Sequence, residues 1–431
     1  MFTGKLQSKL VGGLLACLAL CGTAAGVTPE EVRTFAAKGA DFLLTQQDTN
    51  SASPTYGAFR PTLGGAFPAL NQDTSTGRIG LGLVGAYKVT GDTRYLNGAI
   101  LAGHRLRART GDFAPADPLF LVSLSPITGD VQFRDFARLC FFEALQAGTY
   151  VGEGHTHDTN AYLLDIRASH AGMDANLKTW DLSPMVRAAA TLNYPSKSQF
   201  RSALEDSMDA IYPGKVRYLS GGAIDPAVSR LHDEWALAAG LLALREIGDP
   251  RGYVSAGTNG FLPGRNLSSL ADAAVGFQIG AGAFAGAWPD ITTGDIVPAA
   301  PPLGDTRATA ATVEALSSFA YGAVTPPGSV ITLPPGPGLP PVPYDTNVEV
   351  ALTAEAITAA CSIRVISMPP GGEPPGFRHD EAAIDAGFAF LQQMQLDSGQ
   401  EVTPLPVPEP ATLSLLALGG LVALARRRRR K

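Results

Sequence analysis

Near its start the chain reads Lys38-Gly39-Ala40-Asp41-Phe42-Leu43-Leu44-Thr45-Gln46-Gln47, which is a basic residue, a glycine, two residues, an aromatic residue, a leucine, three residues and a glutamine. Near the other end, Ala386-Gly387-Phe388-Ala389-Phe390-Leu391-Gln392-Gln393-Met394-Gln395 repeats this pattern, and Gly399 follows. Both stretches carry apolar residues at helical spacing. The repeat predicts that the first and last helices of the body are structural equivalents.

The segments between these two ends are also helical in pattern. They are rich in alanine and leucine, and almost none of them alternates with the period of two that marks a strand. Short connections such as Gly91-Asp92 and Gly248-Asp249-Pro250 pair a helix stop with a helix start, which is typical of helix pairs. Candidate helices lie at 29–47, 77–90, 92–109, 131–147, 159–170, 181–193, 196–211, 232–247, 268–284, 304–321, 345–364 and 379–396.

An acidic start signal recurs before half of these candidate helices. Asp-Thr pairs begin at Asp73, Asp158, Asp305 and Asp345, and Asp181 and Asp233 stand at the same place before two more. An aspartate at this position accepts a hydrogen bond from a free backbone N–H and suits the positive end of the helix dipole. Six such starts over about twelve helices predict an all-α fold, an α/α toroid of six helical hairpins.

The Lys38 to Gln47 and Ala386 to Gln395 stretches resemble the front half of the Gln-Trp repeat of terpene-cyclase and prenyltransferase toroids. The resemblance implies that the first and last hairpins close a ring. The tryptophan of that repeat is absent from both stretches, because Phe59 follows Gln47 late and Glu401 occupies the second position. The Asp-x-Asp-Asp acid of the cyclases and the zinc ligands of the prenyltransferases are also missing. The resemblance therefore predicts architecture and carries over no cyclase activity; six-hairpin glycosidases and polysaccharide lyases share this architecture.

The carboxyl end carries a different kind of signal. Pro408-Glu409-Pro410 precedes an apolar run from Ala411 to Ala425, and the chain ends in a cluster of cations, Arg426, Arg427, Arg428, Arg429, Arg430 and Lys431. The cations fix that end on the cytoplasmic side of a membrane. This order resembles the PEP-CTERM sorting signal, which implies processing by an exosortase in a Gram-negative bacterium. The alternative is a plain C-terminal transmembrane anchor that is never processed.

The amino end has the layout of a secretory signal peptide. Lys5 and Lys9 precede the apolar stretch 10–20, and small residues follow up to Gly26. The sequence thus predicts a signal peptide at 1–25, a toroid at 26–400, a linker at 401–406 and the sorting signal at 407–431. The predicted route runs through the Sec translocon to a precursor anchored in the inner membrane, then to the cell surface or extracellular matrix.

The predicted body is acidic. Subtracting Lys5, Lys9 and the six terminal cations from the 33 basic residues, and Glu409 from the 39 acidic residues, leaves 25 against 38, a net charge of −13. A body with this charge does not bind nucleic acid through phosphate contacts. Of the four cysteines, Cys140 and Cys361 remain in the body, either as two free thiols or as one disulfide.

The acidic helix starts are candidate catalytic groups. If they belong to inner helices, they gather at one rim of the toroid, and cleavage of a glycoside needs two carboxyl groups, one protonated and one ionised. The alternative is that each is only a helix cap. The candidates are Asp73, Asp158, Asp233, Glu234, Asp305 and Asp345.

The densest polar segment runs from Gly152 to Asn160 and includes His155 and His157. The two histidines, with His170 or Glu153, are candidate ligands of a divalent metal. The same residues could instead form a sugar-binding rim, supply the base of a lyase, or lie in a solvated loop. No cofactor is predicted.

These observations predict an exported, exosortase-processed protein of the cell surface or exopolysaccharide matrix, without an assigned biochemical activity. The alternative is a carbohydrate-active enzyme, a polysaccharide hydrolase or lyase, with its carboxylates at the rim of the toroid. Expected partners are the exosortase, the Sec translocon and exopolysaccharide.

Overall fold

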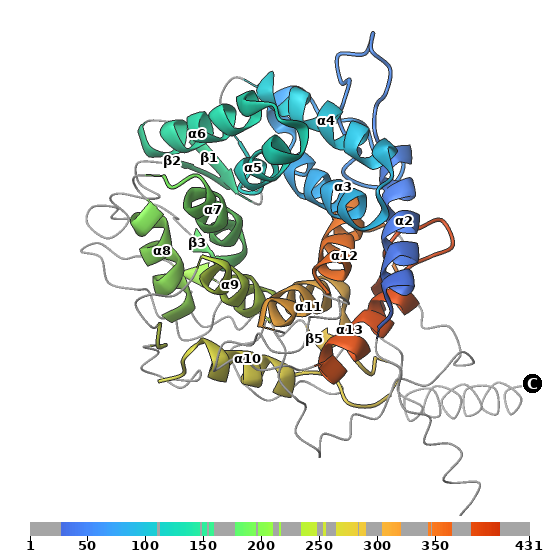
Figure 1. The fold of residues 1–431 in the computed structure, drawn as a ribbon, viewed down its shortest axis with the longest axis vertical. Coiled ribbons are helices and arrows are strands. Elements are labelled where there is room, and N and C mark those ends of the chain that lie inside the picture. The colour runs from blue at the N-terminus through green and yellow to red at the C-terminus, as the bar shows by residue number, and fades with distance from the viewer. Residues whose placement is uncertain are drawn as a thin grey trace, which may run out of the picture.

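The computed structural model describes the body of the chain with several gaps. The described residues are 27–109, 113–146, 149–152, 155–158, 177–194, 197–209, 215–216, 234–247, 253–255, 264–282, 284–289, 304–319, 344–345, 347–363 and 381–405. Over these residues the helices form two concentric layers around a central axis (Figure 1).

The inner layer is a closed ring of six described helices. Each packs against the next along the chain, and the last packs against the first (Figure 1). In ring order they are α3 (Thr76–Thr90), α5 (Asp117–Thr128), α7 (Thr179–Thr191), α9 (Glu234–Glu246), α11 (Thr306–Phe319) and α12 (Val350–Ser362).

The outer layer consists of the helices that alternate with these along the chain, together with the first and last helices. They are α2 (Pro29–Thr45), α4 (Thr93–Arg107), α6 (Val131–Gln146), α8 (Lys197–Asp209), α10 (Leu267–Gly276) and α13 (Glu381–Met394). Inner and outer helices together make an α/α toroid, which confirms the predicted fold class.

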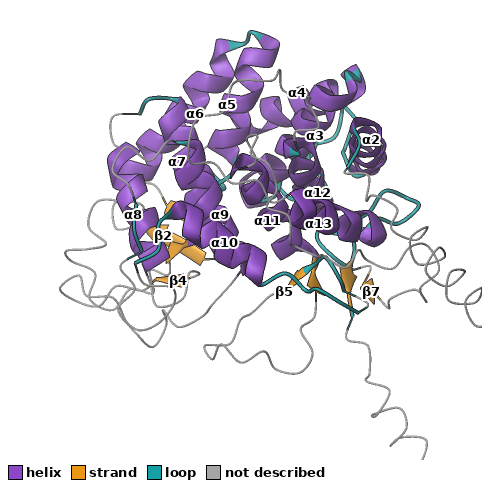
Figure 2. Cartoon of the chain, turned by 60° about the horizontal axis from the view of Figure 1, so that its bottom comes forward, coloured by secondary structure: helices purple, strands orange, loops and turns teal. Residues whose placement is uncertain are grey.

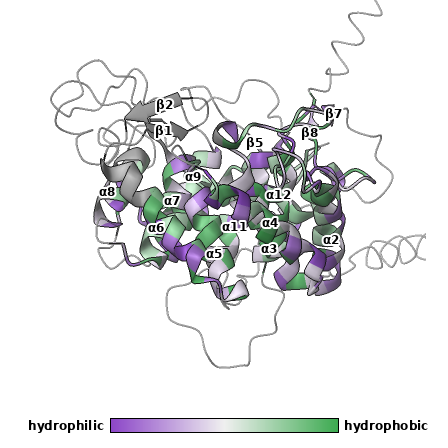
Figure 3. Ribbon diagram, turned by 90° about the horizontal axis from the view of Figure 1, so that it is seen from above, coloured by the Kyte–Doolittle hydropathy of each residue, from purple (hydrophilic) through white to green (hydrophobic). Residues whose placement is uncertain are grey.

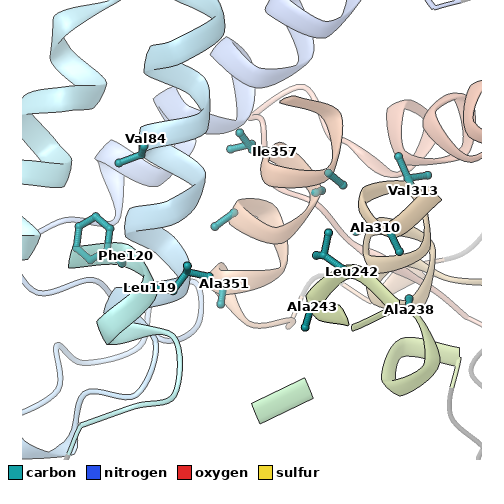
Figure 4. Close-up of a cluster of buried hydrophobic side chains, with 14 of the residues drawn as sticks. Val84, Leu119, Phe120, Ala238, Leu242, Ala243, Ala310, Val313, Ala351 and Ile357 are labelled. Atoms are coloured by element: carbon teal, nitrogen blue, oxygen red, sulfur yellow. The ribbon is translucent and has the colours of Figure 1, made fainter. Parts of the chain in front are cut away.

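Small residues let the inner helices approach one another closely. A Cβ on Gly80 of α3 would lie 2.5 Å from the Phe120 ring of α5, and a Cβ on Gly82 would lie 2.8 Å from Ala354 of α12. Apolar side chains from α3, α5, α9, α11 and α12 fill the space between them (Figure 4). One apolar core thus runs around the ring, and a second, small cluster of Ala287, Phe390, Met394 and Val402 lies beside it.

Three outer helices end in the same turn, which joins a glutamine to a glycine with positive φ. The pairs are Gln47 with Gly57 after α2, Gln278 with Gly286 after α10, and Gln395 with Gly399 after α13. In each turn the glycine N–H donates to the carbonyl of the residue that follows the glutamine, at 2.8 Å. The position two residues after the glycine is fully buried in every case, and it holds Phe59, Trp288 or Glu401.

The glutamine side chain of each turn reaches the neighbouring outer helix. Its Nε2 donates to the carbonyl of Gly98 in α4, of Ala383 in α13, or of Phe35 in α2, at 2.9, 2.8 and 3.1 Å respectively. The last of these bonds joins the final helix to the first. The two end stretches are thus equivalent because both lead into the same turn, and the turn after α13 closes the outer layer. In the third turn the buried position holds Trp288, the tryptophan that the two end stretches lack.

Short strand pairs lie along one rim of the ring. They are β1 (Thr149–Gly152) with β2 (His155–Asp158), β3 (Leu177–Lys178) with β4 (Lys215–Val216), β5 (Trp288–Pro289) with β6 (Gly304–Asp305), and β7 (Tyr344–Asp345) with β8 (Thr403–Pro404), all antiparallel. Figures 2 and 3 show β5 and β7 on the same side of the ring. This is the rim at which the inner helices begin.

The structure corrects three sequence-based expectations. Helix α5 was not predicted, because its sequence is mostly apolar and contains Pro126, so it lacks the helical periodicity that marks its neighbours. Asp158 ends strand β2 rather than starting a helix, and the helix predicted at 159–170 lies outside the described residues. The predicted linker at 401–406 contains strand β8 and the buried residues Glu401 and Val402, so the toroid extends through Pro404.

Within the described residues, no helix is long and apolar enough to cross a bilayer. The predicted sorting segment at 407–431 lies outside them.

Burial of Glu401 sets an expected pH dependence of stability. Burial raises the pKa of this carboxyl well above its usual range, and Gln395 and Lys38 oppose the shift only in part. The folded chain therefore holds a proton that the unfolded chain releases above about pH 4.3, so the free energy of unfolding falls as pH rises from there. We expect Glu401→Gln to raise the free energy of unfolding at pH 7 by more than about 1 kcal/mol. Denaturant unfolding of both proteins between pH 4 and 8 checks this, and equal pH profiles would contradict it.

Candidate functional site

A cavity follows the axis of the toroid and opens at the rim where the inner helices begin. Its inner part has a volume of about 110 Å³ and is lined by residues of all six inner helices. A larger part, of about 410 Å³, forms the mouth. Trp180, Trp235 and Arg307 line both parts. Because these are the second residues of α7, α9 and α11, the mouth lies among aligned helix N-termini.

Two tryptophans form an aromatic surface at the mouth. The Trp180 and Trp235 rings stack with their centroids 4.6 Å apart and an interplanar angle of 11°. The Arg307 guanidinium lies 4.9 Å from the centroid of the Trp235 ring. Both rings are partly exposed, whereas Trp288, the third tryptophan of the chain, is fully buried. The pair therefore offers the flat apolar surface that ligand sites use together with polar groups.

A network of arginines and glutamates surrounds this pair. Arg307 donates through Nε to Glu355 and through Nη2 to Glu349, both at 2.9 Å. Arg78 of α3 donates through Nη1 to the other oxygen of Glu355 at 3.2 Å. Glu355 is thus held between two arginines, on helices from opposite ends of the chain. Such charge-assisted bonds fix side chains in one geometry.

Electrostatic interactions in the network keep Arg307 and Glu349 charged. Burial alone would lower the pKa of Arg307, but the carboxylates of Glu355 and Glu349 outweigh it and raise that pKa. Burial would likewise raise the pKa of Glu349, but Arg307 and Arg78 lower it. These hydrogen bonds use one N–H group of Arg78 and two of Arg307, and each guanidinium has five N–H donors. Both guanidinium groups can therefore also donate to a bound molecule.

A second arginine–glutamate group lies deeper along the axis. Arg187 of α7 bonds Glu246 through Nε and Nη2, at 2.6 and 3.0 Å, and Glu314 of α11 at 3.3 Å. Burial raises the pKa of Glu314, and Arg187 opposes the shift. Arg187 and Glu314 line the inner part of the cavity. The cavity therefore presents both charge signs along its length.

Asp305 and Asp181, like Glu349 before α12, are carboxyl groups that stand at helix starts around this cavity. Asp305 lines the mouth, and its carboxylate accepts the N–H of Ala308 at 2.7 Å. Burial raises the pKa of Asp305, while that hydrogen bond and Arg307 oppose the shift. Asp181, in the first turn of α7, is buried and lines the inner part. Asp305 is thus closer to protonation at neutral pH than an exposed aspartate.

Other predicted site residues do not line the cavity. Asp73 is buried, accepts the N–H of Thr76 at 3.1 Å and pairs with Arg105 at 3.4 Å. Glu234 is fully buried at the start of α9, where it accepts a bond from Thr312 at 3.4 Å. Asp345 is exposed in β7 and accepts the N–H of Asn347 at 2.8 Å. Asp73 caps the start of α3, whereas the helix start predicted at Asp345 is wrong, because α12 begins at Val350 with Glu349 as its N-cap.

The remaining predicted residues are described only in part or not at all. Strand β2 contains His155, His157 and Asp158, which pair in register with Gly152, Tyr150 and Thr149. Asp233 lies outside the described residues. Among the residues whose side chains are described, no group of three metal-ligating side chains is placed to hold a metal ion. The metal site at His155 and His157 therefore stays a prediction.

Sequence reasoning missed most residues that line the cavity. Trp180, Trp235 and Arg307 each occupy the second position of an inner helix, directly beside the acidic start signals. Glu355 lies a full turn into α12 and carries no local signal in the sequence. The start signals therefore predicted the correct rim. Most side chains that line the cavity stand at other positions, since Trp180 precedes Asp181 and Glu355 lies six residues after the N-cap Glu349.

Comparisons with known proteins bear on the tail and on the fold separately. Residues 406–430 match the PEP-CTERM protein-sorting motif. The chain therefore carries the signal of an exported protein that is anchored in the membrane before an exosortase processes it. This confirms the predicted nature of the tail, and the PEP-CTERM match covers no part of the toroid body, which ends before it. No curated protein matches the chain in sequence.

Solved structures of similar shape are distant in sequence. The α-1,6-mannanase GH76A of Salegentibacter sp. HEL1_6 shares 12% identity over 77% of this chain and 98% of its own, with a TM-score of 0.48. The unsaturated glucuronyl hydrolase of Bacillus sp. GL1 shares 14% identity over 70% and 80%, with a TM-score of 0.44. A polysaccharide lyase shares 14% identity over 78% and 96%, with a TM-score of 0.44.

Proposed function

We propose that this exported protein binds a polysaccharide at the mouth of its axial cavity. The observation that carries the proposal is the stacked Trp180–Trp235 pair, which lies beside carboxylates and arginines at the rim of the toroid. A sugar ring has apolar faces and a polar edge of hydroxyl groups. An aromatic surface bordered by bidentate hydrogen-bonding groups complements both parts of that ring.

The size and fixed geometry of the mouth support the same proposal. Its volume of about 410 Å³ falls in the usual range for ligand sites, roughly 300–1,000 Å³. Arg307 and Glu349 at the mouth are held by each other, so a ligand meets groups that are already ordered. Ordered groups lose less conformational entropy on binding.

A second candidate function is cleavage of the bound polymer by a hydrolase or lyase mechanism, and the environment of Asp305 favours it. A raised pKa suits a carboxyl group that donates a proton to a leaving sugar. Asp181, lining the inner part of the cavity, would serve as the ionised partner. Of the catalytic candidates taken from the sequence, only Asp305 enters this proposal.

Incubation of the exported protein with exopolysaccharide from its own producer separates the two candidates. We expect the polymer to co-elute with the protein in size-exclusion chromatography. Shortened polymer would establish cleavage, and Asp305→Asn should then abolish it; this variant keeps the cap on α11, because asparagine is an equally good N-cap. A polymer that neither shortens nor shifts would overturn the proposed function.

The sorting route gives an independent prediction. We propose export through the Sec translocon with removal of residues 1–25, anchoring in the inner membrane through the tail, and delivery to the cell surface or exopolysaccharide matrix. Deleting the exosortase should leave a longer protein that stays with the membrane fraction, because the apolar run 411–425 is retained. Mass spectrometry of membrane and surface fractions checks this. An unchanged mass and location would contradict it.

A further inference from the structure

The chain leaves the toroid at the mouth of the axial cavity. Thr403 of β8 lines the mouth together with Trp180, Trp235 and Asp305. Strand β8 pairs with β7, Asp345 being opposite Thr403, and the Thr306 hydroxyl at the start of α11 donates to the carbonyl of Val402 at 2.7 Å. The last described residue of the toroid, Leu405, is therefore attached to the same rim as the binding site.

Very little chain separates that rim from the membrane segment. The sorting motif begins at residue 406, and the apolar run begins at Ala411, seven residues after Pro404. Fully extended, seven residues span at most about 25 Å. The headgroup layer of one leaflet takes up about 5–7 Å of this length. Pro406, Pro408 and Pro410 also stiffen this tether and favour an extended course.

We propose that anchoring turns the mouth of the cavity toward the membrane, so that the precursor is shielded from long polymers until its tail is processed. The site can lie no further than the tether allows from the bilayer surface, whereas the opposite rim, where the inner helices end, faces away. A short sugar fits into this gap, but a long polymer has to enter it edge-on against the lipid headgroups. Processing of the tail would then also open the mouth of the cavity to long polymers.

The consequence for polymers rests on the proposed function, but the orientation itself can be measured without any ligand. Asn347 is exposed and lines the mouth, and Lys88 is exposed near the end of α3, at the opposite rim. The full-length precursor is placed in lipid nanodiscs as Asn347→Cys or as Lys88→Cys. Each variant is prepared in two versions, one with the natural tether and one with twenty Gly-Ser residues inserted after Pro406. The insertion adds roughly 25 Å of root-mean-square reach. A large polymer-linked maleimide and a small maleimide are then compared.

With the natural tether, we expect the large reagent to modify Asn347→Cys about tenfold more slowly than in the lengthened protein, because the gap excludes it. The small reagent should react equally with both, and Lys88→Cys should be insensitive to tether length. The native Cys140 and Cys361 give the background rate in the unsubstituted chain. Equal rates of the large reagent at Asn347→Cys with both tethers would overturn the proposal. A protein that binds no polysaccharide would overturn the proposed function and leave this orientation result standing.

Discussion

Replacing Gly399 by alanine should lower the free energy of unfolding by about 3 kcal/mol or more. Gly399 has a φ of +91°, which L-residues rarely adopt, and a Cβ there would lie 2.0 Å from the carbonyl oxygen of Lys38. That oxygen belongs to the backbone of α2, so no side chain can move away to relieve the contact. The turn would have to separate from α2, and the Gln395 bond to Phe35 that closes the outer layer would be strained with it.

A matched glycine isolates the effect of this contact. Gly64 also has a positive φ, +72°, but nothing lies within 4 Å of the place where its Cβ would stand. Gly64→Ala should therefore cost only the backbone strain, about 1 kcal/mol. Chemical denaturation of both variants beside the unsubstituted protein gives the comparison. Similar losses for Gly399→Ala and Gly64→Ala would show that ring closure does not depend on this close approach.

Replacing Trp180 by alanine should weaken the binding of oligosaccharides from the producer's polymer by about 10- to 100-fold. The substitution removes one ring of the stacked pair and leaves the Arg307–Glu349–Glu355 network intact. Polar contacts to sugar hydroxyls would remain, but the apolar face of the sugar would lose its partner. Calorimetric titration measures the change in dissociation constant.

An exposed aromatic residue outside the cavity provides the control for this substitution. Tyr56 lies in the connection between α2 and α3, next to Gly57, whose close neighbours are Leu101 and Arg105 of α4. Tyr56→Ala should leave oligosaccharide affinity unchanged. An affinity that falls equally in Tyr56→Ala and Trp180→Ala, or in neither, would place the binding site elsewhere.

Much of the architecture was predictable from local patterns, because helix starts and stops are written into a few residues. The Asp305 start, the Gly91 stop and the repeated glutamine before Gly399 all predicted elements that the structure contains. Helix α5 was not predicted because an inner helix that is buried on nearly every side has no polar face, and so gives no helical periodicity in the sequence. The third glutamine–glycine turn, at Gln278 and Gly286, was not predicted because Leu270 and Ala273 occupy the positions of the glycine and the aromatic residue in the repeated pattern.

The candidate site was predictable only to the level of its rim. Acidic residues at helix starts do gather there, but Asp73 and Asp345 are satisfied by nearby backbone N–H groups and do not line the cavity. Which residue faces the axis depends on the rotation of each helix in the ring. That rotation is set by packing against two inner neighbours and the outer layer, so no single segment encodes that Glu355 meets both Arg78 and Arg307.

Quenching of tryptophan fluorescence tests the central claim most directly. The chain has three tryptophans, of which Trp288 is fully buried and the other two form the stacked pair at the mouth. A soluble quencher such as acrylamide therefore reports on Trp180 and Trp235. If the polysaccharide binds at the mouth, adding it should reduce the quenching constant in parallel with binding. Polymer that binds the protein and leaves the quenching constant unchanged would contradict a site at the mouth of the axial cavity.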